Sequence, residues 1–147
     1  MKTLLFIALA FLGSIFLASC TQAQSGNVDT VASIYWSDGD SGRIDGERFR
    51  LANVDAPETG NVGANNGAQC ESERRLGFEA KAFIIELTRD AEIIVTARGE
   101  PDRYGRIVVS LSVDGRDLAN LGIEAGYLRS WPHRNGRAQT PKPDWCD

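Results

Sequence analysis

The 147-residue chain is short of histidine, cysteine and net positive charge, and each shortage excludes a class of chemistry. Its 1 histidine excludes sites that need several imidazoles from one chain, such as three-histidine zinc sites. Its 3 cysteines are too few for a four-thiolate zinc site or a dense disulfide framework. The formal net charge of −4, from 16 Lys and Arg against 20 Asp and Glu, excludes a strongly basic coat. The groups that remain available for a functional site are carboxylates, arginines and the backbone.

The length and composition indicate one folded unit with an N-terminal leader. Hydrophobic residues make up 42% and charged residues 24% of the chain, which is ordinary for a globular domain. We expect a signal peptide over residues 1–19, a flexible linker over 20–27, a folded domain over 28–131 and a C-terminal tail over 132–147.

The leader is typical of an export signal. Lys2 precedes an apolar run over residues 4–17, which is too short for a comfortable membrane span and is followed by a polar stretch. The letters LASC at residues 17–20 resemble a bacterial lipobox, in which the cysteine is lipidated and becomes the new N-terminus. We therefore expect an exported cell-envelope protein, anchored to the membrane through a lipid on Cys20. The alternative is an ordinary signal cut after Ala23, which would give a secreted protein.

Export also bears on the other two cysteines. Cys70 and Cys146 remain in the mature chain, and an oxidising compartment permits them to pair. We expect a disulfide between them, with two unpaired thiols as the alternative.

The hydrophobic pattern predicts a mainly β fold with two helices. Asp45-Gly46 is a strong signal for a two-residue hairpin, and Ser72 and Asp117 are expected to cap the helices. The predicted strands cover residues 28–35, 42–44, 47–54, 92–98 and 106–113, and the predicted helices cover 73–89 and 118–125. This order suits a five-stranded barrel of the oligonucleotide/oligosaccharide-binding (OB) type, with one inserted helix and a second short helix. Beyond Trp131 the sequence shows little pattern.

Carboxylates at strand ends are candidates for metal binding and for acid–base catalysis. Asp40 and Asp55 are hard oxygen ligands that suit Ca²⁺ or Mg²⁺. Glu58 follows Asp55 by three residues and comes directly after Pro57, which suits a general base acting on water. Each of these carboxylates, taken alone, fits a solvated turn or surface residue better than a functional role.

Two arginines from different strands complete the candidate site. The guanidinium groups of Arg50 and Arg106 match phosphate oxygens in two-point contacts and stay charged at any relevant pH. Hydrolysis of a phosphodiester builds negative charge that such groups stabilise. The alternative for each arginine is an ion pair with a neighbouring acid on the surface.

Three short motifs together resemble the staphylococcal nuclease family. They are DGDS at residues 38–41, RLANVDAPE at 50–58 and YGR at 104–106, in the order and with the approximate spacing of the family pattern. The resemblance extends over about residues 28–131.

This resemblance implies a role for each motif residue. The two aspartates would bind Ca²⁺ together with the main-chain carbonyl of Ala56, and Glu58 would be the general base. The two arginines would hold the scissile phosphate, with Arg103 and Tyr104 beside a terminal phosphate. The implied reaction is Ca²⁺-dependent hydrolysis of DNA and RNA by a monomer.

Departures from the family pattern keep a second class of function open. The segment that helps to hold the base in the family prototype differs here, and Tyr127 and Trp131 are expected either to stack on a base or to pack in the fold. His133 is expected to be a solvated tail residue. The alternative function is a non-catalytic OB-fold module of the cell envelope that binds nucleic acid or protein.

Overall fold

The computed structural model describes residues 29–146. The predicted signal peptide (1–19), the lipidation site Cys20 and the linker (20–27) lie outside the described residues. Within the described part of the chain, no helix has the length and apolarity that a membrane crossing requires.

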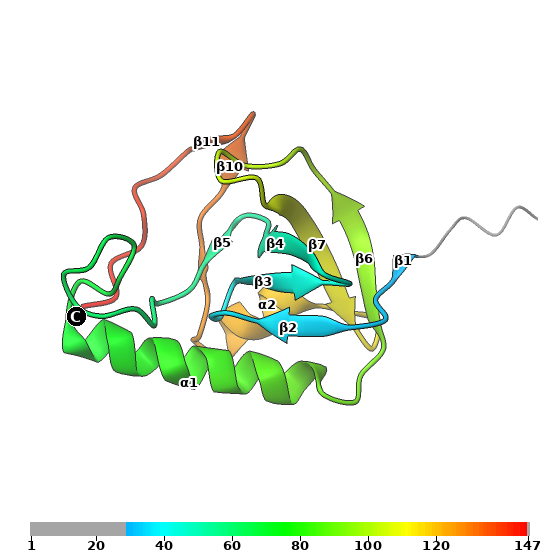
Figure 1. Cartoon of the computed structure of the whole chain (residues 1–147), viewed down its shortest axis with the longest axis horizontal. Coiled ribbons are helices and arrows are strands. Elements are labelled where there is room, and N and C mark those ends of the chain that lie inside the picture. Colours follow the sequence, from blue (N-terminus) through cyan, green and yellow to red (C-terminus); the bar gives the residue numbers. More distant parts are fainter. Residues whose placement is uncertain (1–28, 147) are drawn as a thin grey trace, which may run out of the picture.

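The fold is a curled, half-barrel sheet with two helices, which confirms the predicted fold class (Figure 1). The helices are α1 (Glu71–Thr88) and α2 (Leu118–Glu124). The strands are β1 (Asp29–Thr30), β2 (Ile34–Trp36), β3 (Ser41–Ile44), β4 (Glu47–Leu51), β5 (Val54–Asp55), β6 (Ile93–Arg98), β7 (Ile107–Val113), β8 (Arg116–Asp117), β9 (Arg129–Ser130), β10 (His133–Arg134) and β11 (Arg137–Ala138).

The strand predicted over residues 28–35 is in fact two short strands at opposite ends of the sheet. The main sheet runs β1-β6-β7-β4-β3-β2, so β1 pairs with β6 while β2 pairs with β3. Between them, the backbone N–H of Ser33 donates to the Asp45 carboxylate at 2.7 Å, and Asp45 N–H donates to Ser33 O at 3.0 Å. These bonds fix the crossing of the chain from one edge of the sheet to the other, so the sheet curls.

The hairpin predicted at Asp45-Gly46 is confirmed. Both residues have positive φ, +48° and +86°, as a type I′ turn requires. The turn joins β3 to β4, and β4 then pairs in parallel with β7, with Arg50 opposite Val108. Arg106, directly before β7, therefore reaches the same region of the sheet as Arg50.

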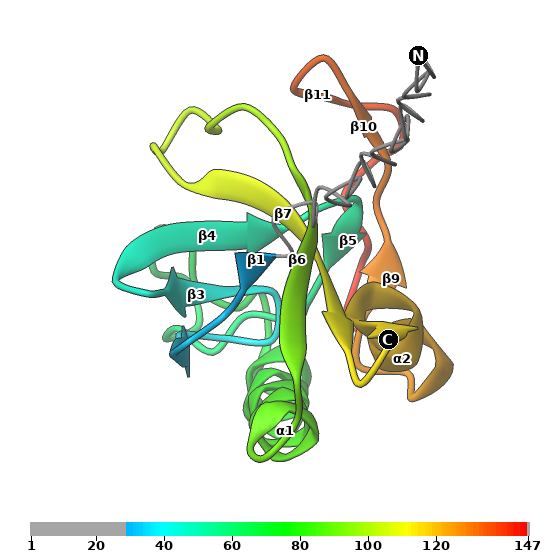
Figure 2. The ribbon, with the colours of Figure 1, turned by 90° about the vertical axis from the view of Figure 1, so that its right-hand side faces the viewer.

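Helix α1 runs along one side of the curled sheet, as Figures 1 and 2 show. Its Ala80 and Ile84 are fully buried, and Thr88 accepts a hydrogen bond from the indole of Trp36 at 3.0 Å. The cap predicted at Ser72 is wrong: the helix starts earlier, and the sulfur of Cys70 accepts from Glu73 N–H. The helix thus begins two residues earlier than predicted, and the first of them, Glu71, carries an acidic side chain that suits the positive end of the helix dipole.

The second helix ends and begins as its sequence predicts. The Asp117 side chain accepts from Asn120 N–H at 2.8 Å, and Gly126 follows the helix with φ +80°. Both helices and the sheet enclose one core, whose buried hydrophobic residues are Trp36, Ile44, Phe49, Leu51, Val54, Ala56, Ile84, Ile93, Ile107, Val109, Leu111, Val113, Leu118 and Leu128.

The chain after Trp131 is ordered into the fold rather than patternless. The strands β10 and β11 form a hairpin through Asn135-Gly136, whose φ angles of +51° and +72° again fit a type I′ turn. Residues 139–146, which we call the C-terminal strap, then return to the start of α1 (Figure 1). There Cys146 forms a disulfide with Cys70.

Candidate active site

The turn before β3 fixes the position of Asp40. The Asp38 carboxylate accepts from the backbone N–H groups of Asp40 and Ser41, at 3.1 and 2.8 Å, and from the Ser41 hydroxyl at 2.9 Å. Gly39 has no room for a side chain, since a Cβ there would lie 2.9 Å from Ala56 Cβ. The turn that carries Asp40 is therefore packed directly against the segment that follows Asp55.

The segment after β5 carries the second aspartate and the glutamate. Asp55 is 1% exposed, and its Oδ2 accepts from the indole N–H of Trp145 at 2.9 Å. Ala56 is buried beside it, and the backbone N–H of Glu58 donates to the buried Glu73 carboxylate at 3.3 Å. Two interactions with distant parts of the chain thus hold this segment in place.

Helix α1 supplies the surface on which Glu58 rests. A Cβ at Gly77 would lie 2.5 Å from the Glu58 carbonyl oxygen and 2.8 Å from that of Pro57. Glycine at this position of the helix therefore lets the backbone of the Glu58 segment approach the helix closely.

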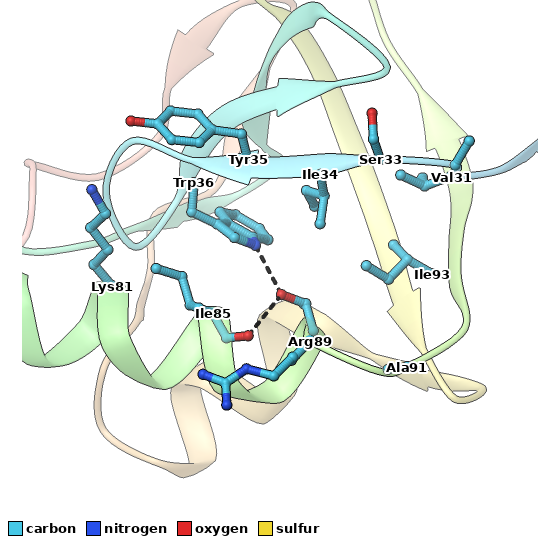
Figure 3. A pocket seen from close by; sticks show the side chains of 12 residues that line it. Val31, Ser33, Ile34, Tyr35, Trp36, Lys81, Ile85, Arg89, Ala91 and Ile93 are labelled. Carbon is cyan, nitrogen blue, oxygen red and sulfur yellow. Dashed lines mark hydrogen bonds between the residues drawn. The ribbon is translucent and has the colours of Figure 1, made fainter.

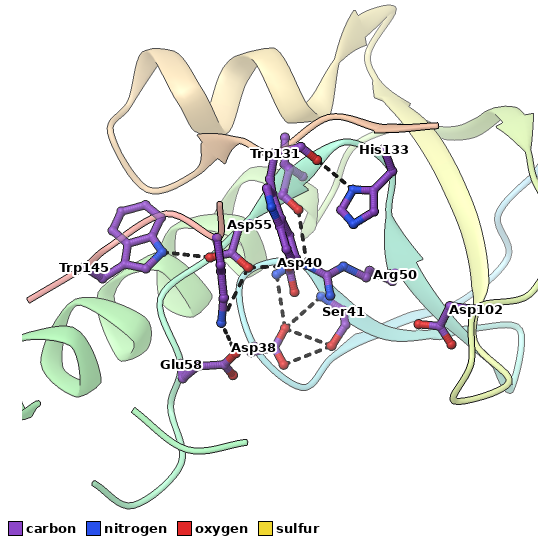
Figure 4. A network of polar contacts seen from close by, with 12 residues as sticks. Asp38, Asp40, Ser41, Arg50, Asp55, Glu58, Asp102, Trp131, His133 and Trp145 are labelled. Atoms are coloured by element: carbon purple, nitrogen blue, oxygen red, sulfur yellow. Dashed lines mark hydrogen bonds and ion pairs between the residues drawn. The ribbon is translucent and has the colours of Figure 1, made fainter. Parts of the chain in front are cut away.

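Arg50 joins the two aspartates. Its Nη2 lies 3.1 Å from Asp40 Oδ2 and 3.4 Å from Asp55 Oδ1, and it also donates to the Val54 carbonyl at 3.3 Å. The guanidinium carbon lies 5.1 Å from the centre of the Trp131 ring, within cation–π range. Figure 4 shows these side chains meeting at one place, with Trp145 approaching from the other side.

A second cation comes from the C-terminal strap. Lys142 Nζ lies 2.9 Å from Glu58 Oε1 and 3.6 Å from Asp55 Oδ1. Sequence reasoning missed both Lys142 and Trp145, because no local pattern connects them with a segment more than 80 residues earlier.

Arg106 borders a groove that extends to Arg50 of this cluster. The groove, of about 930 Å³, is bordered by both predicted phosphate-binding arginines and by Arg103, Tyr104 and Trp131. Arg106 forms an ion pair with Asp102 at 2.7 Å, and Figure 4 shows Asp102 apart from the aspartate cluster. Arg50 is thus the residue that the groove and the carboxylate cluster share.

The remaining predicted residues border the groove, except Tyr127, which is half-buried against helix α1. Tyr104 is 46% exposed, with the Arg103 guanidinium 4.7 Å from its ring centre. Trp131 faces the groove, whereas Tyr127 packs against Phe83 with ring centres 4.9 Å apart. His133 is exposed, as expected, but its ring packs against Trp131 at 4.5 Å and it borders the groove.

Burial dominates the electrostatics of the carboxylate cluster. It raises the pKa of Asp40 well above the ordinary value, against the attraction of Arg50. Burial also raises the pKa of Asp55, although Trp145, Lys142 and Arg50 act in the opposite direction. The pKa of Glu58 is raised for the same reason, and the hydrogen bond from Lys142 opposes it. Three carboxylates thus share two cations, which leaves an excess of negative charge.

The donor set fits a hard divalent cation. Carboxylate oxygens are the ligands that Ca²⁺ and Mg²⁺ prefer, and the cluster has three carboxylates with no sulfur or imidazole among them. Across residues 29–146, a different group of potential ligands has all its ligand atoms within 4.8 Å of one another: Cys70, Glu73 and Cys146. That grouping is not a metal site, because its sulfurs form the disulfide and Glu73 accepts two backbone N–H groups.

A separate hollow of about 590 Å³ between β2 and α1 has a different character (Figure 3). Its lining includes Ile34, Trp36, Ile85 and Ile93, and none of the motif residues borders it. The chemistry of the chain is therefore concentrated at the carboxylate cluster and its groove.

The family model described as staphylococcal nuclease homologue matches residues 48–142 of this chain. The match covers more than half of the sequence, so the chain belongs to the staphylococcal nuclease family, as its motifs predict. Membership of this family indicates a nuclease-type function. No curated protein matches the chain. Asp40 precedes the matched region and Trp145 follows it. The DGDS motif and the structure connect Asp40 with the site, whereas Trp145 is connected with it by the structure alone.

Proposed function

We propose that the protein is a Ca²⁺-dependent nuclease that hydrolyses phosphodiester bonds of DNA and RNA. The observation that carries this proposal is Arg50, which contacts both Asp40 and Asp55 at the end of a groove that Arg106 also borders. Hydrolysis of a phosphodiester needs a base, groups that bind the phosphate and a way to stabilise growing negative charge. The residues of the cluster and the groove supply all three.

Each residue has a role that follows from its chemistry. Asp40, Asp55 and the main-chain carbonyl of Ala56 would hold Ca²⁺, which when bound polarises the phosphate. The Glu58 carboxylate would accept the proton of the attacking water, and burial raises its pKa in the direction that suits a base near neutral pH. Arg50 and Arg106 would bind the phosphate oxygens and stabilise the charge that develops on them.

The aromatic side chains of the groove favour a single-stranded or frayed nucleic acid, whose bases are free to stack on them. Tyr104 and Trp131 offer aromatic faces on which bases stack, and Arg103 adds a positive charge for a terminal phosphate. The net charge of −4 limits non-specific attraction to the backbone, so we expect modest substrate affinity and a strong requirement for the metal.

Digestion of plasmid DNA and of RNA, with Ca²⁺ and with a chelator, tests the proposal. We expect cleavage with Ca²⁺ alone, and a loss of about 10²–10⁴-fold in rate for Glu58→Gln, because the water then lacks its base. Arg106→Ala is expected to lose about 10²–10³-fold through weaker charge stabilisation. Glu79→Gln, on the exposed side of α1, is the matched control. Cleavage that persists in chelator contradicts the metal assignment.

One observation favours the alternative, a non-catalytic OB-fold module that binds nucleic acid or protein in the cell envelope. The Lys142 ammonium forms an ion pair with the carboxylate of Glu58, which in the proposed reaction must accept a proton from water. The same digestion assay distinguishes the two functions, because a binding module would leave both the DNA and the RNA uncut.

We also propose that the protein is exported and acts as a monomer at the cell envelope or in secreted form. The apolar run at residues 4–17 and the cysteine at position 20 support a lipid anchor. Mass measurement of the membrane-fraction protein tests this, with acyl chains on Cys20 as the expected result and a soluble mature chain beginning after Ala23 as the contrary one.

A further inference from the structure

The C-terminal strap places an ammonium group between Asp55, a proposed metal ligand, and Glu58, the proposed general base. Lys142 Nζ lies 2.9 Å from Glu58 Oε1 and 3.6 Å from Asp55 Oδ1. We propose that Lys142 is an intramolecular competitor of the divalent cation, which the ion must displace before the site can act. This inference rests on the proposed metal site.

The contact with Lys142 keeps the site inactive. A carboxylate that pairs with an ammonium at 2.9 Å has an oxygen lone pair engaged and a positive charge beside it, so it is a weaker base for water. The same ammonium partly neutralises Asp55, which reduces the attraction of that carboxylate for a second cation. Lys142 therefore opposes both metal binding and proton abstraction.

The arrangement permits displacement. The side chain of Lys142 is 35% exposed, whereas that of Asp55 is 2% exposed, so the ammonium approaches the buried carboxylate from the solvent side. A long, flexible lysine side chain can swing back into water without disturbing the core, and its charge is readily hydrated there.

Several contacts keep the strap beside the site. Cys146, four residues after Lys142, is bonded to Cys70 at the start of α1. The buried indole of Trp145 donates to Asp55, and the guanidinium of Arg129 lies 4.2 Å from its ring centre. A competitor held in this way has a high effective concentration at the carboxylates, which free lysine in solution would not reach.

Titration of Ca²⁺ into the metal-free protein by calorimetry measures the competition directly, without reference to activity. We expect Lys142→Met to bind Ca²⁺ about tenfold more tightly than the wild type, since a partly screened charge leaves the site. Lys81→Met is the matched control, because Lys81 borders the separate hollow between β2 and α1. It removes the same charge elsewhere and is expected to leave the affinity unchanged.

The double variant Cys70→Ser/Cys146→Ser tests the tether. Release of the strap is expected to tighten Ca²⁺ binding in the wild-type background and to have no further effect when Lys142→Met is also present. Equal tightening in both backgrounds would assign the effect to the strap and overturn the role of Lys142.

The titration separates the inference from the function on which it rests. Ca²⁺ that binds equally well to the wild type and to Lys142→Met overturns the competition but leaves the metal site standing. Failure of both proteins to bind Ca²⁺ at millimolar concentration shows that the proposed metal site is itself wrong.

Discussion

Among single residues, the buried aspartates determine how the site responds to pH. Burial raises the pKa of Asp40 and of Asp55 above ordinary values, so in the folded, metal-free protein both bind protons more readily than in the unfolded chain. A group with a raised folded pKa contributes stability that is fully present below the unfolded pKa and is lost as the pH rises through the folded pKa. Ca²⁺ binding requires the opposite, ionised state.

Asp40→Asn should therefore stabilise the metal-free protein while it weakens the metal site. In chelator at neutral pH, we expect the free energy of unfolding to rise by on the order of 1 kcal/mol, because a costly buried charge is removed and Arg50 keeps Asp55 as a partner. Urea unfolding of the wild type in chelator should show increasing stability as the pH falls from neutral toward about 4, and the variant should show a smaller increase. A variant less stable than the wild type at neutral pH would mean that the attraction of Arg50 outweighs burial.

At the scale of elements, helix α1 supports the segment that carries Glu58. Gly77 has no Cβ, and the carbonyl groups of Pro57 and Glu58 fill the space that a Cβ would need. The position of the proposed general base therefore depends on a residue of the helix that carries no chemistry of its own.

Gly77→Ala adds only one methyl group, but we expect it to reduce both stability and activity. Alanine favours the helix by about 1 kcal/mol over glycine, yet a Cβ 2.5 Å from the Glu58 carbonyl oxygen must push that segment away. We expect a net destabilisation of about 1–3 kcal/mol from overpacking and a loss of about 10²-fold in cleavage rate from the displaced Glu58. Thermal unfolding and the digestion assay measure the two effects.

Gly99→Ala serves as the control for stability, because a Cβ there would lie at an ordinary distance of 3.5 Å from the Val108 carbonyl oxygen. Equal unfolding temperatures for the two alanine variants, together with normal cleavage by Gly77→Ala, would refute the role given to Gly77.

Elements set by neighbouring residues were predictable from the sequence. Asp45-Gly46 specifies its turn through two positive φ angles, and Asp117 caps its helix through a bond three residues away. Asn135-Gly136 carries the same kind of turn signal, so the hairpin of β10 and β11 was visible in the sequence although the prolines around it suggested an irregular tail.

Contacts between distant segments explain what the sequence did not reveal. The division of residues 28–35 into β1 and β2 depends on the bonds of Ser33 to Asp45, which only the assembled sheet brings together. The pairing of Lys142 with Glu58, 84 residues apart, has no local signature at all. The motifs thus selected carboxylates and an arginine that the structure brings together, and the packing of distant segments determines which cations pair with them.

For the molecule as a whole, the disulfide between Cys70 and Cys146 closes a separation of 76 residues. The chain-entropy account gives a stabilisation of about 4 kcal/mol for a loop of this size. We expect the Cys70→Ser/Cys146→Ser variant to lose stability of this order in urea unfolding, relative to the oxidised wild type. A loss well below about 1 kcal/mol would mean that the strap is held chiefly by its non-covalent contacts, such as that of Trp145 with Asp55.

The partners of Asp55 have a consequence for how the molecule reaches its working state. Trp145 follows Asp55 by 90 residues and Arg50 precedes it by five. The Asp55 carboxylate therefore contacts one partner close to it in the sequence and one very far from it. Long-range pairings of this kind slow folding and form late, after the costly closure of large loops. We therefore expect the contacts around Asp55 to form together in a late folding step. A truncated or partly folded chain would contain the three motifs but would not bring their side chains together.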